Sequence, residues 1–379
     1  MRSKIKINFR NKVLYVLFIS AIFDLLRYMI NCVLKDIFKN PIIKLLLMSL
    51  GESLSFILYI IYLKKNSYRN KKSELFYSSR NKKFINFMLF LCSFLKVIGN
   101  FDFLYFYSYK IKKREDILDN LDIIFFTLLV CINEHSILKI QTYKHHKLGI
   151  FFIIFALIIL TLSNYLRIFN QFNTKKFIYV IILSFENQFL LSYLYIIEKK
   201  LNYEYFINIF KMSCFEGLFG IIIIIFLMII NQVFFIDSIL NFNNFSLFIK
   251  QINNILNFLL IITFIILSCL INIFRLKITE FTRPSTNSIG HLLSIFFIDI
   301  FDSFYKGPKI QIFSYDIIFS SIFSIIGTFI FCEVIVLNFC NFDKYTFDKL
   351  SRRSEDDTIK TINFLSFSSG SDYSGSINE

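Results

Sequence analysis

The sequence is poor in the residues that metal sites and catalytic sites require. Its 379 residues include only four histidines, too few for the several histidine boxes of an integral-membrane desaturase. Two of them lie in "YKHHKLG" at 143–149, which is more typical of a cytosolic turn than of a metal site. The seven cysteines stand singly in mostly apolar runs, with no CxxC pair and no metal-ligand spacing. We interpret these cysteines as small buried apolar residues, and we expect no metal and no cofactor.

Motifs for nucleotide binding and for hydrolysis are also missing. The chain has no P-loop, no glycine-rich phosphate cradle and no nucleophile elbow. Its formal net charge of +15 could indicate nucleic acid as a partner, but the basic residues lie mostly between long apolar runs and form no stripe interleaved with aromatics. We therefore expect neither an enzyme nor a nucleic-acid-binding protein.

Apolar residues are what the sequence has in excess. It is 55% hydrophobic and contains 51 phenylalanines, and its mean hydropathy of +0.59 is too high for an ordinary soluble domain. A helix that crosses a membrane needs about 20 apolar residues. Ten segments meet this requirement: 13–30, 42–63, 84–107, 117–133, 148–166, 177–197, 206–230, 254–274, 286–305 and 314–338. The sequence predicts an all-α integral membrane protein with ten transmembrane helices.

The distribution of lysine and arginine predicts the orientation of these helices. An even number of spans places both termini on one side, and the basic residues concentrate in the connections on that side, most densely at 64–83. Cytosolic termini follow from the positive-inside rule. The 64–83 loop is read as a topology determinant that contacts anionic lipid, with partner binding as the alternative. The tail at 341–379 ends "SFSSGSDYSGSINE" and is expected to be a disordered cytosolic segment.

Polar residues inside the apolar segments recur with helical spacing. In the first segment Ser20, Asp24, Arg27 and Asn31 fall on one helical face, and Asp24 and Arg27 are close enough to pair. An ionisable group at mid-bilayer costs about 2.5–3.5 kcal/mol, so it faces protein or water. Similar stripes in several segments predict a water-accessible cavity, with hydrogen bonds that only join the helices as the alternative. The expected cavity residues are Asp24, Arg27, Glu52, Lys96, Glu216, Asn287 and His291.

The seventh segment opens with two glycines beside a carboxylate, in "CFEGLFGIIIIIFLMII" at 214–230. Small residues allow helices to approach closely, so we interpret Gly217 and Gly220 as helix-packing positions, with gating as the alternative. Glu216 faces the same side of the helix as Gly220. We treat Glu216 as a candidate carrier of a coupling proton.

Four stretches together resemble the drug/metabolite transporter superfamily, in particular the F branch of the solute carrier 35 family, which is related to nucleotide-sugar transporters. They are "NPIIKLLLMSLGESLSFILY" at 40–59, "YIIEKKLNYEYF" at 195–206, "FEGLFG" at 215–220 and "ITEFTRPSTNS" at 278–288. The resemblance implies two inverted five-helix repeats at 1–170 and 171–340, with the fifth and tenth spans outside the cavity. It also implies an intracellular membrane such as Golgi or a lysosome-like vacuole.

The ninth segment departs from this resemblance. Members of the family place an arginine, an aspartate and a second arginine where this chain has Asn287, His291 and Ser294. The family's substrates therefore do not carry over to this chain.

These observations give two hypotheses of different classes. The first is a secondary-active transporter that moves a small polar or charged solute by alternating access, with proton coupling through Glu216. The second is a non-transporting scaffold or adaptor that presents its basic loop and tail to other proteins. The expected partners are a small-molecule solute and the lipid bilayer, and a homodimer is a further option.

Overall fold

The computed structural model describes residues 2–34, 41–65, 82–110, 115–139, 144–169, 174–234, 254–287 and 315–331, with isolated positions at 248, 249, 252, 290, 291, 294, 297, 298, 301 and 335. This part of the chain is helical and contains no strand. Its helices are α1 (Arg2–Val33), α2 (Pro41–Ser53), α3 (Ser55–Lys65), α5 (Lys82–Lys110), α6 (Glu115–Ser136), α7 (Lys144–Phe169), α8 (Thr174–Tyr205), α9 (Ile209–Phe234), α11 (Ile255–Phe281) and α13 (Tyr315–Phe331).

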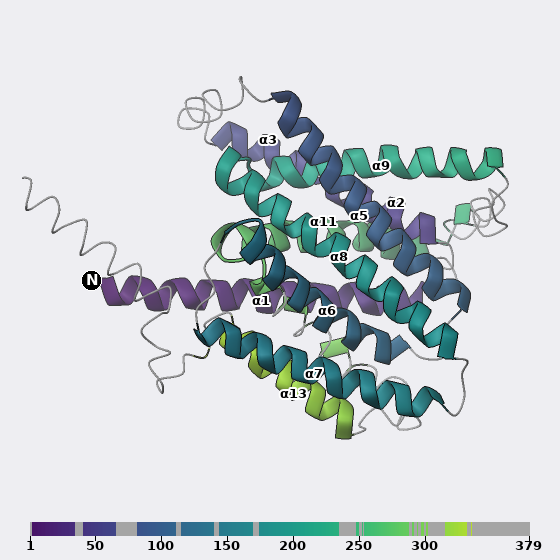
Figure 1. The fold of residues 1–379 in the computed structure, drawn as a ribbon. Coiled ribbons are helices and arrows are strands. Elements are labelled where there is room, and N and C mark those ends of the chain that lie inside the picture. The colour runs from purple at the N-terminus through teal and green to yellow at the C-terminus, as the bar shows by residue number, and fades with distance from the viewer. Residues whose placement is uncertain are drawn as a thin grey trace, which may run out of the picture.

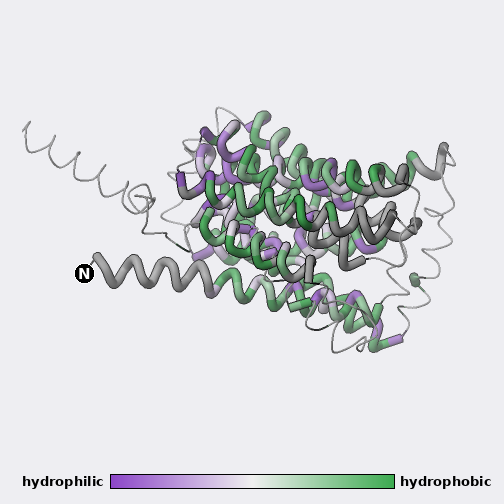
Figure 2. Tube along the Cα trace, turned by 60° about the horizontal axis from the view of Figure 1, so that its bottom comes forward, coloured by the Kyte–Doolittle hydropathy of each residue, from purple (hydrophilic) through white to green (hydrophobic). Residues whose placement is uncertain are grey.

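Several of these helices are long and apolar enough to cross a membrane. Within the described residues there are five candidate spans: Tyr15–Val33, Ile42–Lys65, Lys82–Asn100, Ile209–Ile230 and Ile255–Glu280. Apolar residues predominate along much of the described bundle (Figure 2). A helix satisfies its own backbone hydrogen bonds, which is why continuous apolar runs of this length favour helices.

The helices agree with nine of the ten expected segments, but several extend further than hydropathy predicted. α8 continues beyond residue 197 to Tyr205, and α11 continues beyond residue 274 to Phe281. The ninth segment lies mostly outside the described residues, as do most of the 64–83 loop and the whole 341–379 tail. The division into inverted repeats at 1–170 and 171–340 stays a prediction.

The second segment is broken, which the sequence did not predict. α2 ends at Ser53 and α3 begins at Ser55, with a turn at Leu54. The Ser55 hydroxyl donates to the carbonyl of Glu52 at 2.6 Å and to the carbonyl of Phe210 in α9 at 3.1 Å. A serine that bonds nearby carbonyls competes with the regular helix pattern. The break therefore lies directly beside Glu52.

The helices pack as a bundle around a buried core (Figure 1). α9 packs on α2 and α5, α8 packs on α5 and α6, and α11 packs on α1 and α2. The largest buried cluster joins α5, α6, α8, α9 and α11 through residues such as Leu89, Val130, Leu194, Met212 and Leu276. Five cysteines are described, and four of them are buried, in agreement with their interpretation as apolar packing residues.

α7 and α13 form a pair along one edge of the bundle (Figure 1). They cross at two glycines. A Cβ added to Gly149 would lie 2.7 Å from the carbonyl oxygen of Gly327, and a Cβ added to Gly327 would lie 2.8 Å from the carbonyl oxygen of Gly149. Small residues are what permit two helix backbones to approach this closely.

Candidate functional site

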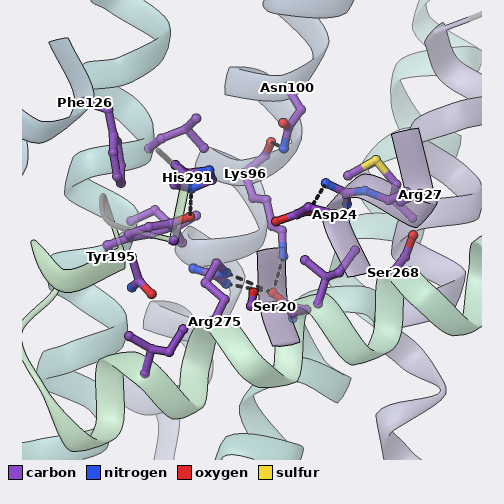
Figure 3. A pocket seen from close by; sticks show the side chains of 18 of the residues that line it. Ser20, Asp24, Arg27, Lys96, Asn100, Phe126, Tyr195, Ser268, Arg275 and His291 are labelled. Carbon is purple, nitrogen blue, oxygen red and sulfur yellow. Dashed lines mark hydrogen bonds and ion pairs between the residues drawn. The ribbon is translucent and has the colours of Figure 1, made fainter. Parts of the chain in front are cut away.

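A cavity of about 270 Å³ lies at the centre of the bundle. Its walls come from α1, α2, α5, α6, α8 and α11 and from Asn287, Gly290 and His291 (Figure 3). Among the side chains that the structure describes, none from α7 or α13 lines it. Of the seven expected cavity residues, six line it: Asp24, Arg27, Glu52, Lys96, Asn287 and His291. The seventh, Glu216, is buried behind the wall and bonds to Lys96.

Lys96 of α5 is the point where three other helices meet. Its Nζ lies 2.7 Å from Glu52 Oε1 in α2 and 3.4 Å from Glu216 Oε2 in α9. It also donates a hydrogen bond to Asn272 Oδ1 in α11 at 3.0 Å. One lysine therefore links two carboxylates and an amide from three helices. Figure 3 shows the Lys96 side chain extending into the cavity.

Arg275 of α11 forms the second cationic centre. Its guanidinium binds both oxygens of Glu198 in α8, at 2.5 and 2.7 Å, in the bidentate geometry that favours arginine over lysine. The same guanidinium lies 4.6 Å from the centroid of the Tyr195 ring, within the range of a cation–π contact. Its Nη2 also lies 3.5 Å from Glu216 Oε2. Arg275 thus connects α8, α9 and α11.

Glu216 joins the two cationic centres. Its Oε2 accepts hydrogen bonds from Lys96, Asn272 and Arg275. Its Oε1 is buried and has no hydrogen-bond partner among the described residues. We call Glu52, Lys96, Glu198, Glu216, Asn272 and Arg275 the central network; it holds three carboxylates and two cations. A buried charge without a counter-charge is costly, so this imbalance needs a chemical explanation.

The pair that helical spacing predicted in the first segment is present. Arg27 Nη2 lies 2.9 Å from Asp24 Oδ1. The second oxygen of Asp24 accepts from the Ser294 hydroxyl at 3.1 Å. Both charged groups face the cavity (Figure 3). Asp24 therefore links α1 to the ninth segment.

The two expected residues of the ninth segment make polar contacts with different helices. His291 Nε2 lies 3.3 Å from the Tyr195 hydroxyl in α8, and its ring packs edge-on against Phe126 of α6 (Figure 3). Asn287 donates from Nδ2 to the Thr279 hydroxyl of α11 at 2.7 Å. These contacts hold the start of the ninth segment against the cavity wall.

The two glycines of α9 face α2. A Cβ added to Gly217 would collide with backbone atoms of Ser49, Glu52 and Ser53. A Cβ added to Gly220 would lie 2.9 Å from the Ser49 hydroxyl oxygen, a side-chain atom. Gly217 therefore marks the closer backbone approach between α9 and α2.

A second set of polar contacts lies around residues 279–286, which we call the 279–286 corner. Lys199 of α8 donates to the carbonyl oxygens of Thr279 at 2.8 Å, Glu280 at 3.2 Å and Thr282 at 2.7 Å. These carbonyls lie at the end of α11, where helix geometry leaves acceptors unsatisfied. Lys199 therefore caps α11 from a neighbouring helix.

Two further helices hold the same corner. The buried carboxylate of Glu134 in α6 accepts from the backbone N–H of Ser285 at 2.6 Å. Arg283 Nη1 lies 3.1 Å from His146 Nε2 in α7. The expected turn at 143–149 is wrong, because α7 begins at Lys144 and its first turn contains both histidines. Within the described residues, no three candidate ligands lie close enough to hold a metal ion.

Sequence reasoning missed half of the central network. Glu198 and Arg275 lie just beyond the expected segments at 177–197 and 254–274, and Asn272 lies inside the second of these. An i, i+3 spacing could have indicated Asn272 and Arg275 as a pair, because they are three residues apart and bond at 2.8 Å. No local spacing indicates the pairing of Arg275 with Glu198, which lies on another helix.

The chain matches no family model and no curated protein sequence. The resemblance to the drug/metabolite transporter superfamily accordingly stays a prediction.

Proposed function

We propose that this chain is a multi-pass membrane protein that acts as a secondary-active transporter for a small polar or charged solute. The observation that carries the proposal is a charged cavity enclosed by apolar helices. Six helices contribute to its walls, and the central network couples four of them. Ionisable groups at this position in apolar helices usually face a solute or ion pathway.

Contacts between the two expected repeats support alternating access. Residues before 171 and residues after it meet at Lys96–Glu216, 3.4 Å, at Asp24–Ser294, 3.1 Å, and at Glu134–Ser285, 2.6 Å. A rocking motion between two repeats would break and remake a small set of polar contacts of this kind. We propose that these contacts define one of the two states of the transport cycle.

The 279–286 corner is proposed to be the closed end in this state. With the orientation predicted from basic residues, α6 and α11 end and α7 begins on the cytosolic side. Three helices bind the corner through Glu134, His146 and Lys199. The break between α2 and α3 lies beside Glu52. It supports the proposal that the cavity is a transport site, because such sites are commonly built at discontinuous helices.

The charge balance of the site supports a solute with a cationic group, or a coupled proton. The cations nearest the cavity centre already have carboxylate partners: Arg27 pairs with Asp24, Lys96 with Glu52, and Arg275 with Glu198. Glu216 is the additional carboxylate of the central network, and Asp122 of α6, which accepts from the Ser184 hydroxyl, is a further carboxylate in the cavity wall. A proton or a cationic group that enters this network balances its charge, and the buried Oε1 of Glu216 is the oxygen left to accept it.

The experiment is uptake into proteoliposomes that contain the purified chain. The panel includes nucleotide sugars, amino acids, peptides and organic cations, each measured with and without a pH gradient. We expect saturable uptake of one class, and we expect Glu216→Gln to abolish its dependence on the gradient. Glu204→Gln is the matched control, because Glu204 is half exposed and pairs only with Lys200 at 3.8 Å among the described residues.

Two outcomes oppose the proposal in different ways. Unchanged gradient dependence in Glu216→Gln contradicts the proton role and leaves transport standing. A folded wild-type chain that moves no member of the panel contradicts transport itself. Such a result favours the scaffold hypothesis, provided that the chain also recovers a stable protein partner.

A further inference from the structure

A second hollow, separate from the cavity, lies where α5 and α9 begin and α8 ends. Its volume is about 160 Å³. Figure 1 shows these three helix ends at the same end of the bundle as the end of α3. We call it the α5–α9 pocket. The lining residues that matter here are Lys82, Asn86, Tyr205, Phe206, Lys211 and Phe215.

The α5–α9 pocket is positively charged. Lys82 and Lys211 line it, and no described acidic side chain does. Neither lysine has an ion-pair or hydrogen-bond partner for its side chain in the part of the chain that the structure describes. Lys96 and Lys199, in contrast, each bind two or more oxygens. The pocket thus offers two cations whose charge no group of the described helices balances.

The remaining walls are aromatic and apolar. Phe215 packs against the main hydrophobic cluster, and Tyr205 packs on Phe84 with ring centroids 5.9 Å apart. Phe206 is 63% exposed. Its backbone adopts a φ of 51°, which bulky residues rarely take. A soluble anion has no need of such walls, whereas a lipid has a charged headgroup joined to apolar chains.

The pocket also lies at the boundary of the apolar part of the bundle. Lys82 begins the candidate span Lys82–Asn100, and Lys211 lies in the first turn of the candidate span Ile209–Ile230. Lysine heads with apolar stems and aromatic rings are typical of the membrane–water interface. At about 160 Å³ the pocket is smaller than the roughly 300–1,000 Å³ of small-molecule sites, so it fits a headgroup and not a whole lipid.

We propose that the α5–α9 pocket binds the headgroup phosphate of an anionic phospholipid. Lys82 and Lys211 contact the phosphate, Asn86 donates a hydrogen bond to it, and Phe206 and Phe215 contact the glycerol and the first methylenes of the acyl chains. The inference requires that the chain lies in a membrane, and it is independent of transport. A bound lipid joins the first turns of α5 and α9, the helices that carry Lys96 and Glu216.

The test is lipid binding to the purified full-length chain, measured by native mass spectrometry and by the melting temperature in detergent. The added ligands are phosphatidylglycerol, phosphatidylcholine and inorganic phosphate. We expect phosphatidylglycerol to bind and to raise the melting temperature, and we expect the other two to have little effect. The Lys82→Gln/Lys211→Gln variant is expected to weaken binding roughly tenfold or more, because each basic residue near an anionic surface contributes about fivefold.

Lys64→Gln/Lys65→Gln is the matched control. It removes the same charge from exposed lysines at the end of α3, outside the pocket. We expect this variant to bind phosphatidylglycerol within about twofold of the wild type, because exposed charges outside the pocket contribute little to binding. Equal losses in the two double variants would show non-specific attraction and overturn the proposal.

Phe206→Ala separates a lipid from a soluble anion. This substitution keeps both lysines and the charge of the pocket, but it removes the aromatic contact with the lipid. We therefore expect it to weaken phosphatidylglycerol binding severalfold. The variant should keep its melting temperature in lipid-free detergent. If inorganic phosphate stabilises the wild type as strongly as phosphatidylglycerol does, and Phe206→Ala changes neither, the pocket binds a soluble anion and the lipid proposal is wrong.

Discussion

Single residues carry much of the polar coupling among the described helices, and Lys96 joins α5 to α2, α9 and α11. It is the direct counter-charge of Glu52 and one of two cations beside Glu216, and all three side chains are largely buried. Removing one partner of a buried ion pair leaves the other charge uncompensated. The consequences for stability are therefore larger than those of an exposed lysine.

We predict that Lys96→Met lowers the stability of the chain by about 3–5 kcal/mol. The sequence has no tryptophan, so unfolding is best followed with a dye that fluoresces on reaction with thiols. The buried Cys92, Cys131, Cys214 and Cys269 become reactive only when the bundle opens. Lys96→Met/Glu52→Gln is expected to recover part of the loss. A melting temperature equal to that of the wild type in Lys96→Met would contradict the central role of this lysine.

A second residue-scale prediction concerns Arg275, where charge and shape can be separated. Arg275→Lys keeps the positive charge but loses the two parallel bonds to Glu198 and the stacking on Tyr195. We expect Arg275→Lys to lower the melting temperature, and Arg275→Gln to lower it further. Equal melting temperatures for Arg275→Lys and the wild type would show that charge alone is sufficient.

At the scale of the element, the glycines of α9 set how closely this helix packs against α2. Gly217 faces the backbone of α2, whereas Gly220 faces the movable Ser49 side chain. We predict that Gly217→Ala lowers expression and melting temperature strongly, while Gly220→Ala has a smaller effect. The comparison is made by fluorescence-detected gel filtration of both variants. If Gly220→Ala proves the more damaging, the close approach lies one turn further along α9.

The lengths of the elements also explain what the sequence could predict. Nine of the ten long apolar runs coincide with helices, and spacing alone predicted the Asp24–Arg27 pair. Hydropathy ends a segment where the apolar run stops, but a helix continues while its charges find partners. Glu198 and Arg275 are each other's partner across α8 and α11, so neither can be recognised until both helices are placed side by side. The break at Leu54 depends on Phe210 of α9 in the same way.

At the scale of the whole molecule, α6, α8 and α11 contribute to both the 279–286 corner and the cavity wall. Lys199→Met removes three hydrogen bonds from the end of α11, so we predict a shift toward a state in which this end is open. The measurement is the labelling rate of Asn287→Cys by a membrane-impermeant thiol reagent. We expect labelling to be severalfold faster in the Lys199→Met background than in the wild type.

The control for this prediction is the neighbouring residue on α8. Lys200→Met removes an equal charge, but the Lys200 side chain is only partly buried and its pairing with Glu204 spans 3.8 Å. The labelling rate in this background should match that of the wild type. Similar acceleration by both substitutions would mean that surface charge, and not the corner, controls access.

The α7–α13 pair has a consequence for how related sequences should vary. None of its described side chains lines the cavity, and the pair is joined through Gly149 and Gly327. Outward residues such as Phe151, Ile158 and Leu162 are more than half exposed. Selection on the proposed solute therefore does not reach them, and any apolar side chain satisfies their surroundings. In an alignment of orthologues we expect the outward positions of this pair to vary freely among apolar residues. We expect the two glycines and His146, which contacts Arg283, to vary little.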